Sequence, residues 1–169
     1  MTEHLSGRVV PPDDAHAYWN RGALWTVCLS ADQTQGAFTL LEQLMPKGNA
    51  PPPHVHERAT EGFYVIEGEV DFTVDGRTVH AGPGTSAWIP PNTEHSFVIT
   101  SPEARVLNFY PPGGFDDRLD YLATPAGART LRPPDFRDAN DEERVAAYRD
   151  RIRDLHEETP VGDWTEPGS

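Results

Sequence analysis

The chain has 169 residues and a formal net charge of −13, because 27 Asp and Glu oppose 14 Lys and Arg. This length fits one domain with extensions, and it suffices to bury a core without disulfides or a structural metal. The negative charge would repel phosphate backbones and anionic lipids, so neither nucleic acid nor a membrane is expected as a partner.

Cysteine content and hydropathy limit the class of protein further. Cys28 is the single cysteine, which excludes an intrachain disulfide and a cysteine-based zinc site. The first residues contain no apolar segment of signal-peptide length, and no run approaches a membrane span. We therefore expect a soluble, cytoplasmic protein, and the frequent Pro, Arg and Asp are typical of a bacterium with a GC-rich genome.

Residues 1–22 are polar and are interrupted by Pro11 and Pro12. Asp13 is placed to cap a short helix that would extend through Trp19. The sequence therefore predicts an N-terminal arm that lies against the core.

Residues 23–112 form the predicted core, in which short segments rich in Val, Ile, Phe, Thr and Trp alternate with Gly and Pro. Apolar and polar residues alternate over 70–75, as in a half-buried strand. The dipeptide Asp75-Gly76 follows and favours a type I′ hairpin turn. Many short strands without a helical period between them predict an all-β antiparallel sandwich or barrel.

Residues 113–169 change to a helical pattern. Apolar residues spaced by four and three predict a short amphipathic helix over 114–122. Asn140 and Glu143 resemble a capping box, and a second helix is predicted over 140–158, followed by a polar tail. The segment is therefore predicted to be a helical extension of the core.

Histidines and a glutamate stand at regular spacing in the segment 48–68. His54 and His56 are two residues apart, so on a strand their side chains project from the same face. Glu61 follows after a short turn and can approach the same point from the next strand. Two histidines and one carboxylate are a set that holds divalent iron and similar ions while leaving coordination positions open.

A second segment, 84–99, supplies a further histidine. His95 follows a turn that contains Pro90 and Asn92. Three histidines and one glutamate would fill four positions of an octahedral shell and leave two for water, dioxygen or a substrate oxygen. We predict that His54, His56, Glu61 and His95 bind one divalent metal ion per chain, with Fe, Ni, Mn, Co and Zn all open as its identity.

Other candidate residues have plainer explanations. Single histidines are more often surface residues than ligands, so His4, His16, His80 and His156 are expected to face solvent. Several large apolar residues could line the barrel lumen or simply form its core: Phe63, Val65, Trp88, Phe97 and Phe109. Phe63 and Val65 share a strand face with Glu61, and Phe97 shares one with His95, so these three are the predicted substrate-lining residues.

The two segments resemble the paired motifs of the cupin superfamily. The first motif matches at every position: Gly48, His54, His56, Glu61 and Gly68. The second matches at Gly84, Pro90 and His95, and it departs at Asn92, where Gly is usual, and at Ile99, where Asn is usual. The resemblance covers roughly residues 23–122 and implies a double-stranded β-helix, or jelly-roll, barrel.

A narrower resemblance is to single-domain cupins of the quercetin 2,3-dioxygenase-like group. It rests on the Pro-rich N-terminal arm, the turn formed by residues 112–115 and the helix that follows. This resemblance implies a metal-dependent dioxygenase acting on a small hydroxylated aromatic or enol-type substrate. The wider resemblance to the cupin superfamily also implies a homodimer.

In that reaction the catalytic residue would be Glu61. It would either stay bound to the metal or leave it to accept a substrate proton, and burial in an apolar lumen would raise its pKa. The same ligand set also serves a non-oxidative isomerase, cyclase, epimerase or lyase. A non-catalytic small-molecule-binding protein is the third alternative.

Overall fold

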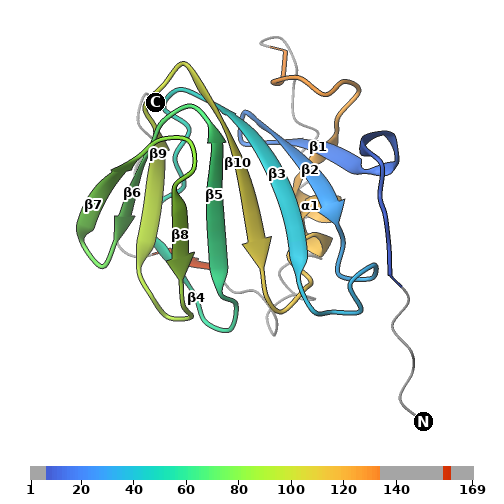
Figure 1. The fold of residues 1–169 in the computed structure, drawn as a ribbon, viewed down its shortest axis with the longest axis horizontal. Helices are drawn as coiled ribbons and strands as arrows, with labels where there is room; N and C mark the ends of the chain where they lie inside the picture. Colours follow the sequence, from blue (N-terminus) through green and yellow to red (C-terminus); the bar gives the residue numbers. More distant parts are fainter. Residues whose placement is uncertain (1–6, 134–157, 161–169) are drawn as a thin grey trace.

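A computed structural model describes residues 7–133 and 158–160. Within these residues two antiparallel sheets form the layers of a β-sandwich (Figure 1). The larger sheet has the strand order β11-β1-β2-β3-β10-β5-β8, and the smaller has β12-β4-β9-β6-β7. The all-β prediction is therefore confirmed.

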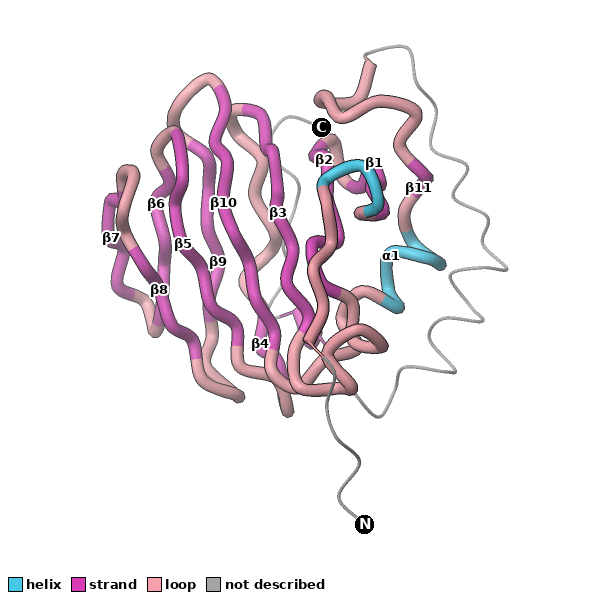
Figure 2. Tube along the Cα trace, turned by 45° about the vertical axis from the view of Figure 1, so that its right-hand side comes forward, coloured by secondary structure: helices cyan, strands magenta, loops and turns pink. Residues whose placement is uncertain are grey.

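The strands of the larger sheet are β1 (His16–Asn20), β2 (Ala23–Leu29), β3 (Thr39–Pro46), β5 (Glu61–Glu67), β8 (Ser86–Ile89), β10 (Glu103–Tyr110) and β11 (Thr124–Pro125). Those of the smaller sheet are β4 (His54–His56), β6 (Val70–Val74), β7 (Arg77–Ala81), β9 (His95–Ile99) and β12 (Glu158–Pro160). One α-helix, α1 (Asp117–Leu122), lies beside β1 in the described part of the chain (Figure 2).

The core lies between the two sheets because their strands alternate between buried and exposed residues. Every second residue of β3 is buried, from Thr39 to Met45. Buried residues of β5 and β10 meet those of β6 and β9, with Val65, Val106 and Val70 each at most 1% exposed. This packing fixes β5 and β9 relative to each other, and β4 is placed by its pairing with β9.

The hairpin predicted at residues 75–76 is present between β6 and β7. Asp75 has φ 48° and Gly76 has φ 73°, the positive angles that a type I′ turn requires. Asn92 also adopts a left-handed backbone, with φ 61°, which explains how it substitutes for the glycine usual at this position.

The helix predicted from Asp13 through Trp19 is wrong. A 3-10 turn, Pro12–Asp14, is followed after Ala15 by strand β1. Arg21 and Gly22 have φ 49° and 79° and form a tight turn, after which β2 pairs with β1. Tyr18 and Trp19 are buried in this hairpin, so cross-strand packing of the aromatic residues outweighs the capping signal.

The C-terminal prediction is confirmed only in part. Helix α1 lies within the predicted range 114–122, and its Leu119 is fully buried. Most of the helix predicted over 140–158 lies outside the described residues. Residues 158–160 form β12, which pairs with β4, so position 158 is extended rather than helical. β4 pairs with β9 on its other side, and β12 thus supplies hydrogen-bond partners to an edge that would otherwise be open.

Candidate metal centre

Two paired strands of the smaller sheet and one strand of the larger sheet bring the four predicted ligands together. His54 and His56 are the first and last residues of β4, and both are buried while Val55 between them is only half-buried. His95 begins β9 and lies directly opposite His54 in the antiparallel pair. Glu61 begins β5 in the other sheet, so the site lies where the two sheets approach each other.

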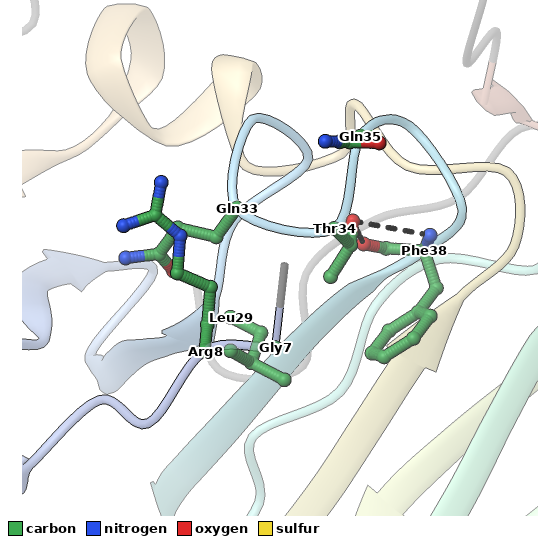
Figure 3. Close-up of a pocket in the computed structure, with 7 residues that line it drawn as sticks. All are labelled: Gly7, Arg8, Leu29, Gln33, Thr34, Gln35 and Phe38. Atoms are coloured by element: carbon green, nitrogen blue, oxygen red, sulfur yellow. Dashed lines mark hydrogen bonds between the residues drawn. The ribbon is translucent and has the colours of Figure 1, made fainter. Parts of the chain in front are cut away.

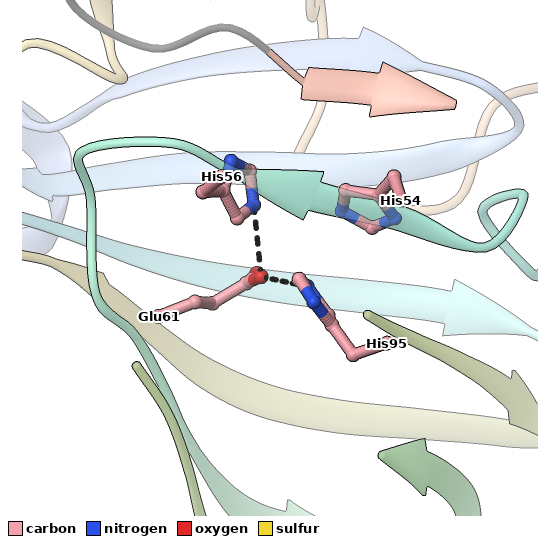
Figure 4. A group of neighbouring side chains, drawn as sticks. All are labelled: His54, His56, Glu61 and His95. Carbon is pink, nitrogen blue, oxygen red and sulfur yellow. Dashed lines mark hydrogen bonds and ion pairs between the residues drawn. The ribbon is translucent and has the colours of Figure 1, made fainter. Parts of the chain in front are cut away.

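The side chains converge on one point (Figure 4). The candidate ligand atoms of the four residues all lie within 4.8 Å of one another. Glu61 Oε2 is 3.1 Å from His56 Nε2 and 2.7 Å from His95 Nε2. All four residues are at most 5% exposed, so the group is shielded from bulk water. The predicted convergence is present, and the four residues could hold one metal ion.

Backbone carbonyl groups orient two of the imidazoles. Nδ1–H of His54 donates to the Pro52 carbonyl at 2.8 Å, and Nδ1–H of His95 donates to the Thr93 carbonyl at 2.9 Å. Since a carbonyl oxygen only accepts, each Nδ1 carries the proton and Nε2 remains as the nitrogen that can bind a metal. His56 Nδ1 is buried without a hydrogen-bond partner among the described residues, so its tautomer is not fixed in this way.

The donor set and its spacing fit a divalent metal ion. Bonds of about 2.1 Å at right angles place neighbouring ligand atoms about 3 Å apart. The separations of 3.1 and 2.7 Å between Glu61 and its two histidines are close to this value. Three imidazoles with one carboxylate suit iron, nickel, manganese, cobalt and zinc alike.

The second oxygen of Glu61 is also bound. Tyr110 donates its hydroxyl to Glu61 Oε1 at 2.5 Å, and Asn108 Nδ2 donates to the same oxygen at 3.1 Å. Both residues are buried on β10. Neither is among the predicted site residues, although the alternation of β10 places Ala104, Val106, Asn108 and Tyr110 on one face. A polar amide and a hydroxyl on a buried face were the available signal.

The pKa of Glu61 contradicts one expectation. Burial acts to raise this pKa, but the hydrogen bonds and charges of His56 and His95 outweigh burial and hold it well below the usual value. The raised pKa predicted from an apolar lumen is therefore wrong, because the surroundings of the carboxylate are polar. These contacts with the two imidazoles favour the ionised form of Glu61.

The predicted substrate-lining residues form part of the core between the two sheets. The Phe63 ring lies 5.0 Å from that of Phe72 and 5.6 Å from that of Phe97, between ring centroids. Val65 is fully buried in the same cluster. Trp88 and Phe109, the other two candidates for the lumen, are 70% and 37% exposed and face outward.

The remaining histidines and a separate hollow lie apart from this group. His16 and His80 are exposed as predicted, whereas His4 and His156 lie outside the described residues. A hollow of about 220 Å³ is lined by Gly7, Arg8, Leu29, Gln33, Thr34, Gln35 and Phe38 (Figure 3). None of these residues belongs to the candidate metal centre.

Comparison with known proteins agrees with the fold and the motifs. Residues 40–110 match the family described as "Cupin domain". This match covers less than half of the chain and includes all four candidate ligands. It is 30% identical over 102 residues to a quercetin 2,3-dioxygenase of Bacillus subtilis, a match that covers 60% of this chain and 30% of that protein. The matched region is thus less than a third of the curated relative.

Solved structures show the same fold. The structure of KdgF from Halomonas sp. aligns with a TM-score of 0.59 at 20% identity, over 66% of this chain and 99% of that one. The polyketide cyclase RemF of Streptomyces resistomycificus aligns with a TM-score of 0.54 at 25% identity, over 63% of this chain and 80% of that one.

None of the helices in the described ranges has the length and apolar character needed to span a bilayer.

Proposed function

We propose that this protein is a metal-dependent cupin enzyme, a quercetin 2,3-dioxygenase-like oxygenase acting on a small hydroxylated aromatic or enol-type substrate. The observation that carries the proposal is the buried convergence of His54, His56, Glu61 and His95. The similarity to a quercetin 2,3-dioxygenase over 60% of the chain supports the oxygenase class.

The residues of the site would have distinct roles in this reaction. His54, His56 and His95 would hold the ion through Nε2, with Glu61 as the fourth ligand. A divalent ion bound there supplies Lewis acidity that lowers the pKa of a coordinated substrate hydroxyl. The ionised Glu61 would balance part of the metal charge, and the nearby apolar cluster of Phe63, Phe72 and Phe97 would exclude water from one side of the substrate.

Oxygen uptake tests the oxygenase directly. Protein loaded separately with Fe, Ni, Mn, Co and Zn is given quercetin and simpler enols in an oxygen electrode. We expect uptake that depends on the metal and on the substrate, and that falls to background in His95→Ala. Substrate conversion that proceeds equally well without dioxygen would contradict the oxygenase, and tight ligand binding without turnover would indicate a non-catalytic binding protein.

A non-oxidative reaction at the same site is the second candidate. The similarity to the polyketide cyclase RemF, at 25% identity, favours it specifically. Lewis-acid activation of an enol serves cyclisation, isomerisation or elimination without an oxidant. Product analysis under strict anaerobiosis separates the two candidates, because a cyclase product retains the mass of its substrate or loses only water.

A further inference from the structure

Both carboxylate oxygens of Glu61 contact buried side chains. Oε2 faces His56 and His95, while Oε1 accepts hydrogen bonds from Tyr110 at 2.5 Å and from Asn108 at 3.1 Å. Glu61, Asn108 and Tyr110 are at most 3% exposed, so water does not compete for these contacts. One carboxylate oxygen of Glu61 therefore contacts the histidines, and the other accepts hydrogen bonds from side chains of β10.

The two donors are themselves fixed. Asn108 Oδ1 accepts a hydrogen bond from Gln43 Nε2 at 2.8 Å, and Asn108 Nδ2 also donates to the Gly62 carbonyl at 3.1 Å. The Tyr110 ring stacks on Phe115 with a centroid separation of 3.8 Å and an interplanar angle of 4°. The stacked ring fixes the position of the Tyr110 hydroxyl oxygen, and the Asn108 amide cannot turn away from Glu61 without breaking its two other hydrogen bonds.

We propose that Gln43, Asn108, Tyr110 and Phe115 form a carboxylate clamp that makes Glu61 a permanent metal ligand through Oε2 alone. Asn108 and Tyr110 are its positioning residues. The inference deepens the proposed function and rests on the same metal site. It decides between the two roles considered for Glu61: the carboxylate does not leave the metal to act as a mobile base.

The geometry also limits how Glu61 can coordinate. Two donors occupy the acceptor positions of Oε1, so this oxygen is not available as a second ligand. A carboxylate bound through one oxygen, together with three imidazoles, leaves positions open for a substrate. In metal sites generally, hydrogen bonds to the carboxylate oxygen that does not bind the metal fix the orientation of the carboxylate. Their loss weakens metal binding about 10–100-fold.

Tyr110→Phe tests the clamp with a matched control in the same apolar cluster. It deletes the hydroxyl and keeps the ring against Phe115. Tyr18→Phe deletes another tyrosine hydroxyl that donates to a carboxylate, that of Asp120, also at 2.5 Å. Metal-free protein is titrated with Co²⁺ in competition with a chelator, and the visible absorption of the bound ion is recorded. Thermal unfolding of both metal-free variants compares their losses of stability.

We expect Tyr110→Phe to bind Co²⁺ about 10–100-fold more weakly and with an altered absorption spectrum, since Oε1 becomes available to the metal. Tyr18→Phe should keep the affinity and spectrum of the wild type. The double variant Gln43→Leu, Asn108→Leu removes the amide pair together, which avoids stranding either partner, and should also weaken and alter Co²⁺ binding.

The outcomes separate the clamp from the metal site. A wild-type protein that binds no Co²⁺ would overturn the proposed function and the clamp with it. If the wild type binds Co²⁺ but Tyr110→Phe and the double variant show the same affinity and spectrum, the clamp is contradicted while the metal site stands. Equal weakening by Tyr18→Phe and Tyr110→Phe would also contradict it, because the effect would then be one of general stability.

Discussion

At the scale of single residues, Gly68 combines a backbone angle and a close approach that only glycine tolerates. Its φ is 82°, and a Cβ placed there would lie 2.7 Å from Ala104 Cα and would also meet the Glu103 carbonyl. We expect Gly68→Ala to lower the free energy of unfolding by about 2–4 kcal/mol. Gly76→Ala is the control, since its φ is 73° but nothing lies within 4 Å, and it should cost only about 1 kcal/mol. Denaturant unfolding measures both, and equal losses would contradict the steric account.

His80 and Asp71 form an ion pair on the surface of the smaller sheet. His80 Nδ1 lies 2.7 Å from Asp71 Oδ1, and this hydrogen bond, with the nearby negative charges, raises the pKa of His80. Because the folded pKa is raised, the pair stabilises the fold below the unfolded pKa of histidine, and that contribution disappears as the pH rises through the folded pKa. An NMR titration should find the His80 pKa above 6.5 and returning toward 6.5 in Asp71→Asn. An unchanged pKa in that variant would show that the pair does not form.

At the scale of elements, β12 covers the outer edge of β4, the strand that carries His54 and His56. A chain truncated after Glu157 lacks β12 and leaves that edge of β4 unpaired, whereas one truncated after Pro160 retains it. We expect amide hydrogen exchange at residues 54–56 to accelerate at least about 10-fold in the shorter form only. Equal exchange in the two truncated forms would show that the pairing contributes nothing to the stability of β4.

The turn between β10 and α1 is anchored by Asp116. Its carboxylate accepts hydrogen bonds from the Ala31 amide at 3.1 and 3.2 Å and from the Thr39 hydroxyl at 2.5 Å. Thr39 is fully buried, so Asp116→Ala leaves its hydroxyl without this acceptor and should cost about 1–3 kcal/mol of stability. Asp13→Ala, at an exposed position, should cost less than about 0.5 kcal/mol in the same unfolding experiment.

At the scale of the whole molecule, the outward face of the larger sheet presents large apolar residues. The register places Trp88 and Phe109 on either side of Gly62, with Tyr64 further along the same face of β5. Trp88 is 70% and Tyr64 is 45% exposed. An apolar face of this kind suits pairing with a second copy, and the homodimer remains our prediction. Light scattering should report a dimer that Trp88→Glu dissociates and that Val79→Glu, on the other sheet, does not; a monomeric wild type would contradict it.

The sequence predicted those features whose signals lie close together in the chain. The His54–His56 spacing, the Asp75-Gly76 turn and the alternation of residues 70–75 each specify local geometry, and the structure contains the expected arrangement. Non-local pairing escaped prediction. β1 was mistaken for a helix because its stability comes from β2 and β11, and β12 pairs with a strand about 100 residues earlier. Asn108 and Tyr110 were missed because their role depends on facing Glu61 across the strand pair.

Metal content tests the central claim most directly. Wild-type protein, His56→Gln and His80→Gln are stripped of metal, loaded with one divalent metal at a time, desalted and assayed by elemental analysis. We predict about one ion per chain in the wild type and in His80→Gln, whose histidine is exposed and outside the candidate site, and a large loss in His56→Gln. Equal metal content in all three proteins, or none in the wild type, would contradict the assignment of His54, His56, Glu61 and His95 as a metal centre.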